Sequence, residues 1–249
     1  MLTEQRHELI LKLLEEKKSI TVAEVKDLLH ASESTIRRDI TALHNAGKLV
    51  RVFGGAVAAE HVYTPYEPTV AQKVEVNKEE KIRIARHAAS LIGPEDFIYL
   101  DAGTTTGYMI EYIDECGTTF VTNAVAHAKR LVTKGMRVLL IGGELKSSTE
   151  AIVGNQAMEM LRNYHFTKGF FGTNGISRKT GFTTPDVNEA MIKRTALGQC
   201  RESYILGDYS KFDHVSSVTF GQFYGSRVIT DRFAEGYGDC ENIIVVKAE

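Results

Sequence analysis

The sequence predicts a two-domain α/β protein, with a small N-terminal domain of helices and a β-hairpin ahead of a larger domain built on a parallel sheet. Two observations predict this fold class. Within residues 1–57, three short helical patterns precede a strand pattern that contains a glycine pair. Within residues 73–249, short apolar runs alternate with helical stretches, as in a parallel sheet with helices on both faces. Residues 58–72 contain two prolines and no clear periodicity, so we expect a linker there.

The N-terminal helices are predicted from apolar spacing and from capping residues. The first covers residues 4–16, and four of its residues are expected to face the core: Leu9, Ile10, Leu13 and Leu14. The second opens with the capping box Thr21–Glu24 and is expected to direct three residues to the same core: Val25, Leu28 and Leu29. The third covers residues 32–43, with Ser32 as its cap and Gly47 after its end. Three short helices with a tight connection predict a helix-turn-helix.

The third helix has one apolar face and one polar face. Ile36, Ile40 and Leu43 form the apolar stripe, while hydroxyls and the adjacent Arg37 and Arg38 project to the other side. Short hydroxyls and guanidinium groups suit a helix that lies in a DNA major groove. The alternative, for this helix taken by itself, is a solvated surface.

Residues 48–57 predict a hairpin beside that helix, which makes the domain a winged helix-turn-helix. Lys48 and Arg51 would contact phosphates, and Gly54–Gly55 would allow a sharp turn or a close approach to a backbone. Glycine pairs also occur in ordinary hairpins. The residues predicted to bind DNA are Ser32, Ser34, Thr35, Arg37, Arg38, Thr41, Lys48, Arg51 and Gly54.

Composition limits the remaining function classes. The 249 residues include 30 basic and 32 acidic ones, so DNA binding would need a local basic patch. The 3 cysteines lie far apart, which argues against disulfides and a zinc site and fits a reducing compartment. No segment approaches the length of a membrane span, and we expect a cytoplasmic protein with no cofactor and no metal.

Local patterns also predict the elements of the larger domain. Asn77 is expected to cap a helix that ends before Gly93–Pro94. The predicted strands are residues 97–100, 120–121, 138–141, 169–171 and 204–206.

The strand ends of the larger domain are predicted to form a ligand crevice, because the carboxyl ends of parallel strands meet at one edge. The segments that follow the strands are Asp101–Thr106, Thr122–Asn123, Gly142–Glu144, Gly172–Gly175 and Asp208–Lys211. The first of them opens a helix and offers free amides to a phosphate. Asp101, Asn123 and Asn174 would bind sugar hydroxyls, and Lys193 or Lys211 would pair with the phosphate charge. Such residues also occur in ordinary strand-to-helix turns.

The N-terminal residues resemble those of the DeoR-type bacterial transcriptional repressors. The resemblance rests on Arg6, on Ser32–Leu43 and on Arg51–Ala56. The usual member has a histidine where this chain has Phe53, so we assign no DNA contact to that position. We interpret Asp39 as a structural residue that holds an arginine in place.

The resemblance continues through the larger domain, in residues 101–106, 122–123, 141–143, 171–176, 189–193 and 208–212. It implies a sugar-phosphate-sensing domain similar in fold to ribose-5-phosphate isomerase. The likeness is greatest to repressors of fructose-utilisation operons, which implies fructose 1-phosphate as the effector. The residues predicted to bind it are Asp101, Gly103, Thr104, Thr105, Thr106, Asn123, Gly142, Gly143, Asn174, Glu189, Lys193 and Lys211.

These features together predict a repressor that a phosphorylated sugar releases from operator DNA. The symmetry of such DNA implies a homodimer or homotetramer. An alternative is a sugar-phosphate isomerase with an appended helical domain, and a third is a protein-binding module. The isomerase needs acidic residues in the loop at 172–175, where this chain has Asn174 and Gly175. Because an amide cannot transfer protons at neutral pH, we expect binding without turnover.

Overall fold

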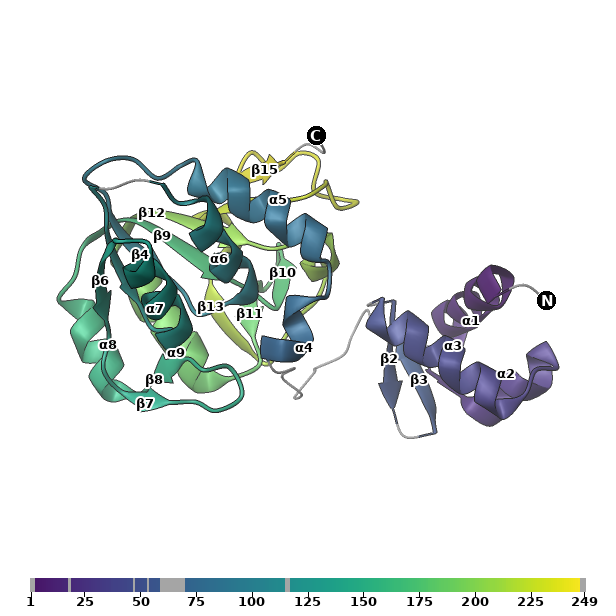
Figure 1. Cartoon of the computed structure of the whole chain (residues 1–249). Coiled ribbons are helices and arrows are strands. Elements are labelled where there is room, and N and C mark those ends of the chain that lie inside the picture. The colour runs from purple at the N-terminus through teal and green to yellow at the C-terminus, as the bar shows by residue number, and fades with distance from the viewer. Residues whose placement is uncertain are drawn as a thin grey trace. The chain divides into compact units, whose positions relative to one another are not determined.

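The computed structural model describes residues 3–17, 19–46, 48–52, 54–58, 70–114 and 117–246. It divides into two compact units, Met1–Tyr63 and Thr64–Glu249 (Figure 1). Most of the expected linker, with both of its prolines, lies outside the described residues, as do Gly47, Phe53 and Cys116. Residues 70–72 of that expected linker are helical. The domain bounds at residues 57 and 72 stay predictions.

The first unit is a winged helix-turn-helix, as predicted. Its elements are α1 (Thr3–Lys17), β1 (Ser19–Thr21), α2 (Val22–Leu29), α3 (Glu33–Asn45), β2 (Leu49–Val52) and β3 (Gly55–Ala58). The hairpin of β2 and β3 is joined by β1, which the sequence did not indicate, to give an antiparallel sheet in the order β1-β3-β2. The side chains of Thr21 and Ser32 accept hydrogen bonds from the amides of Glu24 and Thr35, so both predicted caps are confirmed.

The glycine pair of the hairpin meets both geometric needs that were predicted for it. Gly54 has φ +81°, a conformation that other residues rarely adopt. At Gly55, a side-chain Cβ would lie 2.0 Å from the carbonyl oxygen of Ile20 in β1. A glycine therefore allows the third strand to approach.

Two apolar residues predicted to face this core are exposed instead. Leu9 is 41% exposed and Leu28 is 56% exposed. In α1 the buried residues are Ile10 and Leu14. Leu9 directly precedes Ile10, so its side chain is rotated by about 100° around the helix and points away from the core. Leu28 lies at the same offset from the buried Leu29.

The second unit contains a seven-stranded parallel sheet in the order β15-β14-β12-β9-β4-β5-β6 (Figure 1). These strands are β4 (Phe97–Leu100), β5 (Thr119–Thr122), β6 (Arg137–Leu140), β9 (Phe166–Gly172), β12 (Cys200–Leu206), β14 (Arg227–Thr230) and β15 (Ile243–Val245). All five predicted strands lie in this sheet, and β14 and β15 extend it. A small antiparallel sheet has the order β10-β11-β13, from Gly175–Ser177, Gly181–Thr184 and Val218–Gly221. Strands β7 (Glu144–Leu145) and β8 (Ile152–Val153) form a two-stranded ribbon.

The helices of the second unit are α4 (Val70–Val74), α5 (Lys78–Ala89), α6 (Thr104–Met109), α7 (Val125–Thr133), α8 (Asn155–Arg162) and α9 (Val187–Leu197). Among the described residues, short 3₁₀ turns are η2 (Ile110–Tyr112), η3 (Tyr209–Lys211) and η4 (Phe223–Gly225). The expected cap of α5 is wrong: Asn77 has φ +50° and its side chain makes no capping bond. Its amide donates instead to Asp208 and Ser210, at 2.9 and 3.2 Å.

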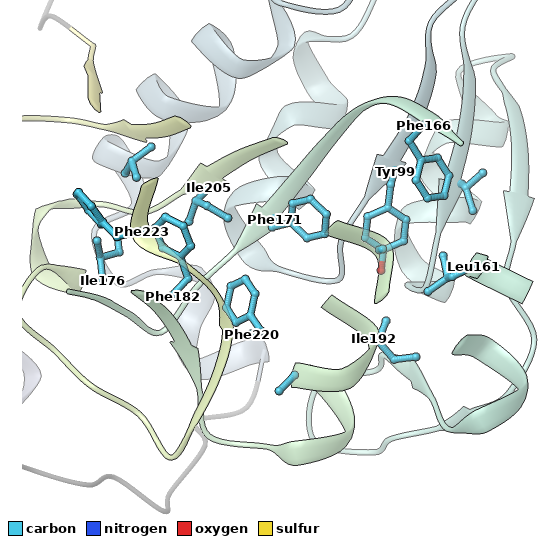
Figure 2. Packing of buried hydrophobic residues seen from close by; sticks show 14 of the residues in the cluster. Tyr99, Leu161, Phe166, Phe171, Ile176, Phe182, Ile192, Ile205, Phe220 and Phe223 are labelled. Carbon is cyan, nitrogen blue, oxygen red and sulfur yellow. The ribbon is translucent and has the colours of Figure 1, made fainter. Parts of the chain in front are cut away.

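Alternating side chains on the strands divide the core into two apolar clusters, one on each face of the sheet. Tyr99 and Phe171 contribute to the cluster that includes residues of α8 and α9 (Figure 2). Their neighbours Leu100 and Phe170 contribute to the cluster that includes residues of α5, α6 and α7.

The strand order changes direction beside β4. The chain runs from β4 to β5 and β6 on one side, and then returns to place β9 and β12 on the other side. Connections after β4 and β9 therefore leave in different directions, and a crevice opens at the carboxyl ends of these strands.

Candidate functional site

The exposed side of α3 carries the polar residues that the sequence assigned to DNA. Ser32 lies at its start, and its hydroxyl is 2.9 Å from that of Ser34 and 2.8 Å from that of Thr35. Arg37 and Arg38 follow on the exposed surface, while Ile36 and Ile40 are buried. The helix therefore separates a packing face from a polar face.

The two arginines of α3 differ in their surroundings. Arg37 donates to the Glu33 carboxylate, one helical turn earlier, at 2.9 and 2.6 Å. Arg38 has no hydrogen-bond or ion-pair partner among the described residues. Asp39 is buried and accepts bonds from Arg6 at 2.7 and 3.1 Å, which confirms its structural interpretation.

The wing is tied to α3 through the polar face. The Arg51 guanidinium donates to the Thr41 hydroxyl at 3.2 Å, and that hydroxyl donates to the carbonyl of Arg37 at 2.7 Å. Lys48 and Gly54 are exposed. Hydrogen bonds thus link Arg51 of the wing to the polar face of α3.

The second unit has a pocket at the carboxyl ends of β4, β9 and β12. Seven of the predicted effector residues line it: Gly103, Thr104, Thr105, Asn174, Glu189, Lys193 and Lys211. The other lining residues are Val70, Gln72, Lys73, Val76, Lys81, Ala102, Thr149, Gly172, Thr173, Leu206, Gly207 and Asp208. The pocket therefore lies at the edge of the sheet where the sequence predicted a ligand crevice.

Three predicted effector residues are buried behind the pocket wall rather than in it. The Asp101 carboxylate pairs with the Lys193 ammonium and accepts the Gly172 amide at 3.0 Å. Burial raises the pKa of the Asp101 carboxyl, and Lys193 opposes that rise. Asn123 accepts from Tyr99 and from the Ala102 amide, at 3.1 and 2.9 Å.

Thr106, the third of these buried residues, donates to the carbonyl groups of Asp101 and Gly103, at 2.7 and 2.9 Å. Thr106, Asp101 and Asn123 therefore fix the loops that carry the lining residues.

Gly142 and Gly143 also lie outside the lining. The Gly142 amide is 3.2 Å from the sulfur of Met160. Gly143 has φ +151°, and a Cβ there would lie 2.5 Å from the carbonyl oxygen of Val153. In this structure, Gly143 allows the backbone before β7 to approach β8, and Gly142 contacts α8.

Lys81 is the main pocket residue that sequence reasoning missed. It is buried on α5, and its ammonium donates to the carbonyl of Lys73. Burial, and then the neighbouring Lys211, lower the pKa of the Lys81 ammonium to about 8. A signal was present, since Lys81 shares the helical stripe of Ile84, Ala85 and Ala88.

Two carboxylates in the pocket are held by neighbouring groups. Glu189 accepts from Thr149 and from Lys146, the latter at 3.1 Å. Asp208 accepts from the amide and hydroxyl of Ser210, at 3.0 and 2.5 Å. Burial acts to raise the pKa of Asp208, but Lys211 and these hydrogen bonds hold it below its ordinary value.

Among the described residues, no three His, Cys, Asp or Glu side chains are placed to hold a metal ion. Within the same residues, no helix combines the length and the apolar character that a membrane crossing needs.

The chain joins a winged helix-turn-helix to an α/β unit with a polar, lysine-lined pocket, an arrangement that defines a ligand-responsive DNA-binding protein. Residues 6–62 match the DeoR-like helix-turn-helix domain, and residues 76–232 match the DeoR C terminal sensor domain. The chain belongs to the DeoR family of transcriptional regulators.

Similar proteins extend over nearly the whole chain. The uncharacterized HTH-type transcriptional regulator FruR of Bacillus subtilis is 41% identical over 92% of this chain and 91% of its own length. The lactose phosphotransferase system repressor of Streptococcus mutans is 35% identical over 90% of this chain and 88% of its own. Ribose 5-phosphate isomerase A of Methanocaldococcus jannaschii aligns with 55% of each chain, at 15% identity and a TM-score of 0.42.

Proposed function

We propose that this protein is a repressor of a sugar-utilisation operon, and that a phosphorylated sugar releases it from operator DNA. The observation that carries the proposal is the lysine-lined pocket in a chain that also presents α3 and the wing. The names of two relatives, a regulator called FruR and a lactose phosphotransferase system repressor, support a sugar operon.

The charges in the pocket support a phosphorylated ligand. Lys211 is close enough to lower the pKa of Lys81, and a phosphate dianion between the two ammonium groups would relieve their repulsion. Asn174 and Glu189 lie in the same pocket and offer partners for hydroxyl groups. A sugar with one phosphate satisfies both sets of groups.

The particular effector that we propose is fructose 1-phosphate, on the basis of the sequence likeness to fructose-operon repressors. Titration calorimetry with fructose 1-phosphate, fructose 6-phosphate and uncharged fructose tests this choice. We expect the first to bind most tightly and fructose not to bind. A clear preference for another sugar phosphate would overturn the choice of fructose 1-phosphate while leaving the phosphate site in place.

Binding of a phosphate beside Lys81 should be accompanied by the uptake of a proton. A dianion beside Lys81 raises the pKa of its ammonium from about 8, so binding at pH values above 8 takes up a proton. At about pH 8.5, calorimetry in buffers of different ionisation enthalpy should detect roughly half a proton or more. The Lys81→Met variant should lose this uptake.

We propose that the pocket binds its ligand without turnover. The loop after β9 presents Asn174, whose side chain accepts a hydrogen bond from Thr184 at 3.2 Å and cannot act as a general base. The competing function is a sugar-phosphate isomerase. Incubating the purified chain with ribose 5-phosphate and fructose phosphates tests it, and turnover at ordinary enzyme rates would reverse our conclusion.

DNA binding is proposed to use two copies of α3 in a homodimer or homotetramer. Half-sites about 34 Å apart would match two symmetric recognition helices. Gel-shift assays with upstream promoter fragments, together with sedimentation of the complex, test both points. A retained complex that fructose 1-phosphate dissociates is expected, and the absence of any complex at low salt would overturn the proposal.

A further inference from the structure

Helix α4 lies at the junction between the pocket and the chain that leads to the winged unit. It begins at Val70, directly after residues 59–69, which lie outside the described residues, and is the first described element of the second unit. Val70, Gln72 and Lys73 from α4 line the pocket, as does Val76 in the turn that follows. A ligand in this pocket therefore meets the segment to which the DNA-binding unit is attached.

Hydrogen bonds at both ends of α4 join it to the body of the second unit. The Tyr108 hydroxyl on α6 donates to the carbonyl of Val74 at 3.1 Å, and α4 lies beside α6 (Figure 1). The Lys81 ammonium donates to the carbonyl of Lys73. At the outer end, the Val70 amide is 3.4 Å from the carbonyl oxygen of Ser148, which is a long hydrogen bond.

The charges across this contact have the same sign. Lys73 belongs to α4, whereas Lys81 and Lys211 belong to α5 and η3 in the body. After burial, both Lys211 and Lys73 lower the pKa of Lys81, so each of their ammonium groups repels that of Lys81 in the pocket. Asp208 and Glu75 offset part of that repulsion. An anion placed among the lysines would offset the remaining repulsion and add an attraction between Lys73 and the body.

We propose that α4 is an anion-operated strap: a ligand phosphate bridges Lys73 on α4 to Lys81 and Lys211 on the body and tightens α4 onto the second unit. This inference rests on the proposed effector pocket and adds how its occupancy reaches the DNA-binding unit. The tightened strap fixes the point where the linker starts, and so restricts the positions that the attached winged unit can take.

Hydrogen–deuterium exchange on the full chain measures the strap directly. On adding fructose 1-phosphate, we expect amides of residues 70–77 to exchange at least about three-fold more slowly, because the ligand binds the docked form of α4. Inorganic phosphate at higher concentration should give the same change, and fructose should give none. Unchanged or faster exchange in residues 70–77, with protection in residues 102–105, would overturn the strap.

A variant outside the pocket lining provides a second test. Tyr108→Phe removes the hydroxyl that holds Val74, and weaker docking of α4 should reduce fructose 1-phosphate affinity about two- to ten-fold. Tyr112→Phe on η2 is the matched control, since the Tyr112 ring instead stacks with Arg86. Equal affinities for the two variants would overturn the strap.

The role of the Lys73 charge is tested by comparing two lysine-to-alanine variants, one on α4 and one on α5. Lys73→Ala should raise the fructose 1-phosphate concentration needed for operator release by about ten-fold or more. Lys78→Ala, which removes an exposed partner of Glu75 outside the pocket lining, should leave that concentration within about two-fold. Identical release by both variants would overturn the role of Lys73.

The outcomes separate the strap from the function on which it rests. If the wild-type chain binds none of the sugar phosphates, the proposed function and the strap both fail. If fructose 1-phosphate binds and releases DNA while residues 70–77 exchange unchanged, the strap alone fails.

Discussion

The polar face of α3 and the pocket of the second unit both gather charged residues, but in opposite environments. The Arg37 and Glu33 side chains of α3 are 57% and 58% exposed, whereas those of Lys193 and Asp101 are 6% and 2% exposed. Water screens the first pair, so its charges are available to a polyanion at small cost. The second pair is desolvated and strongly coupled to its surroundings.

The difference corresponds to two kinds of recognition. DNA presents a regular array of phosphates, and an exposed basic surface gains affinity by releasing counterions from it. A small ligand offers one or two charges, and these must act over short distances in a medium of low dielectric constant. The comparison therefore predicts that charge substitutions affect stability strongly in the pocket and weakly on α3.

The largest effect is expected from Asp101→Asn. The variant leaves the buried Lys193 ammonium without its anionic partner and should reduce the free energy of unfolding by about 3–5 kcal/mol. Urea denaturation followed by circular dichroism measures this loss. The double variant Asp101→Asn, Lys193→Met should recover part of it, and additive losses would contradict a coupled pair.

The second prediction concerns the buried imidazole of His127 on α7. Burial, and then Arg130, lower the pKa of His127 to about 4, below its ordinary value of 6.5. Because the unfolded state binds the proton first, stability should fall by on the order of 3 kcal/mol as pH drops from 6.5 to 4. His127→Gln should flatten this dependence in urea titrations, and the exposed His165→Gln should not.

For a substitution on the exposed face of α3, we expect a change in DNA affinity rather than in stability. Arg38→Ala should leave the unfolding free energy nearly unchanged and cost about 1–3 kcal/mol of operator affinity if its guanidinium contacts a guanine. Fluorescence anisotropy at fixed salt measures this cost. Lys12→Ala on α1 removes the same charge from an exposed position, and an equal loss in both variants would point to a general charge effect.

The smallest effect is expected from Glu33→Gln. Both partners of the Glu33–Arg37 pair are exposed, so the unfolding free energy should change by no more than about 0.5 kcal/mol. Operator binding should not weaken, because the variant frees Arg37 and removes a negative charge. A loss of stability comparable to that of Asp101→Asn would remove the contrast between the two regions.

The elements that could be predicted have local signals. The caps at Thr21 and Ser32, the turn at Gly54 and the strand at Phe97–Leu100 each depend on a few neighbouring residues. Errors arose where burial depends on a distant partner. Leu28 fits a helical stripe, but no element among the described residues of the unit covers it.

For the pocket, too, local sequence predicted the segments involved, whereas packing decided which of their residues line it. The strand-end rule placed Gly103, Asn174 and Lys211 on its lining, but it could not separate them from Asp101 and Asn123, which lie one layer behind. Residues in one strand-to-helix turn point in different directions. Which of them meets a ligand depends on the strands packed alongside.

The sequence by itself determined a winged helix-turn-helix, a parallel sheet and the edge at which its polar turns meet, because propensity, capping and periodicity act over short distances. Only the tertiary structure decided that Lys81 on α5 and Lys73 on α4 enter the pocket beside Lys211. Their helices are separate in the chain, and burial brings these like charges together at a cost that an anion can offset.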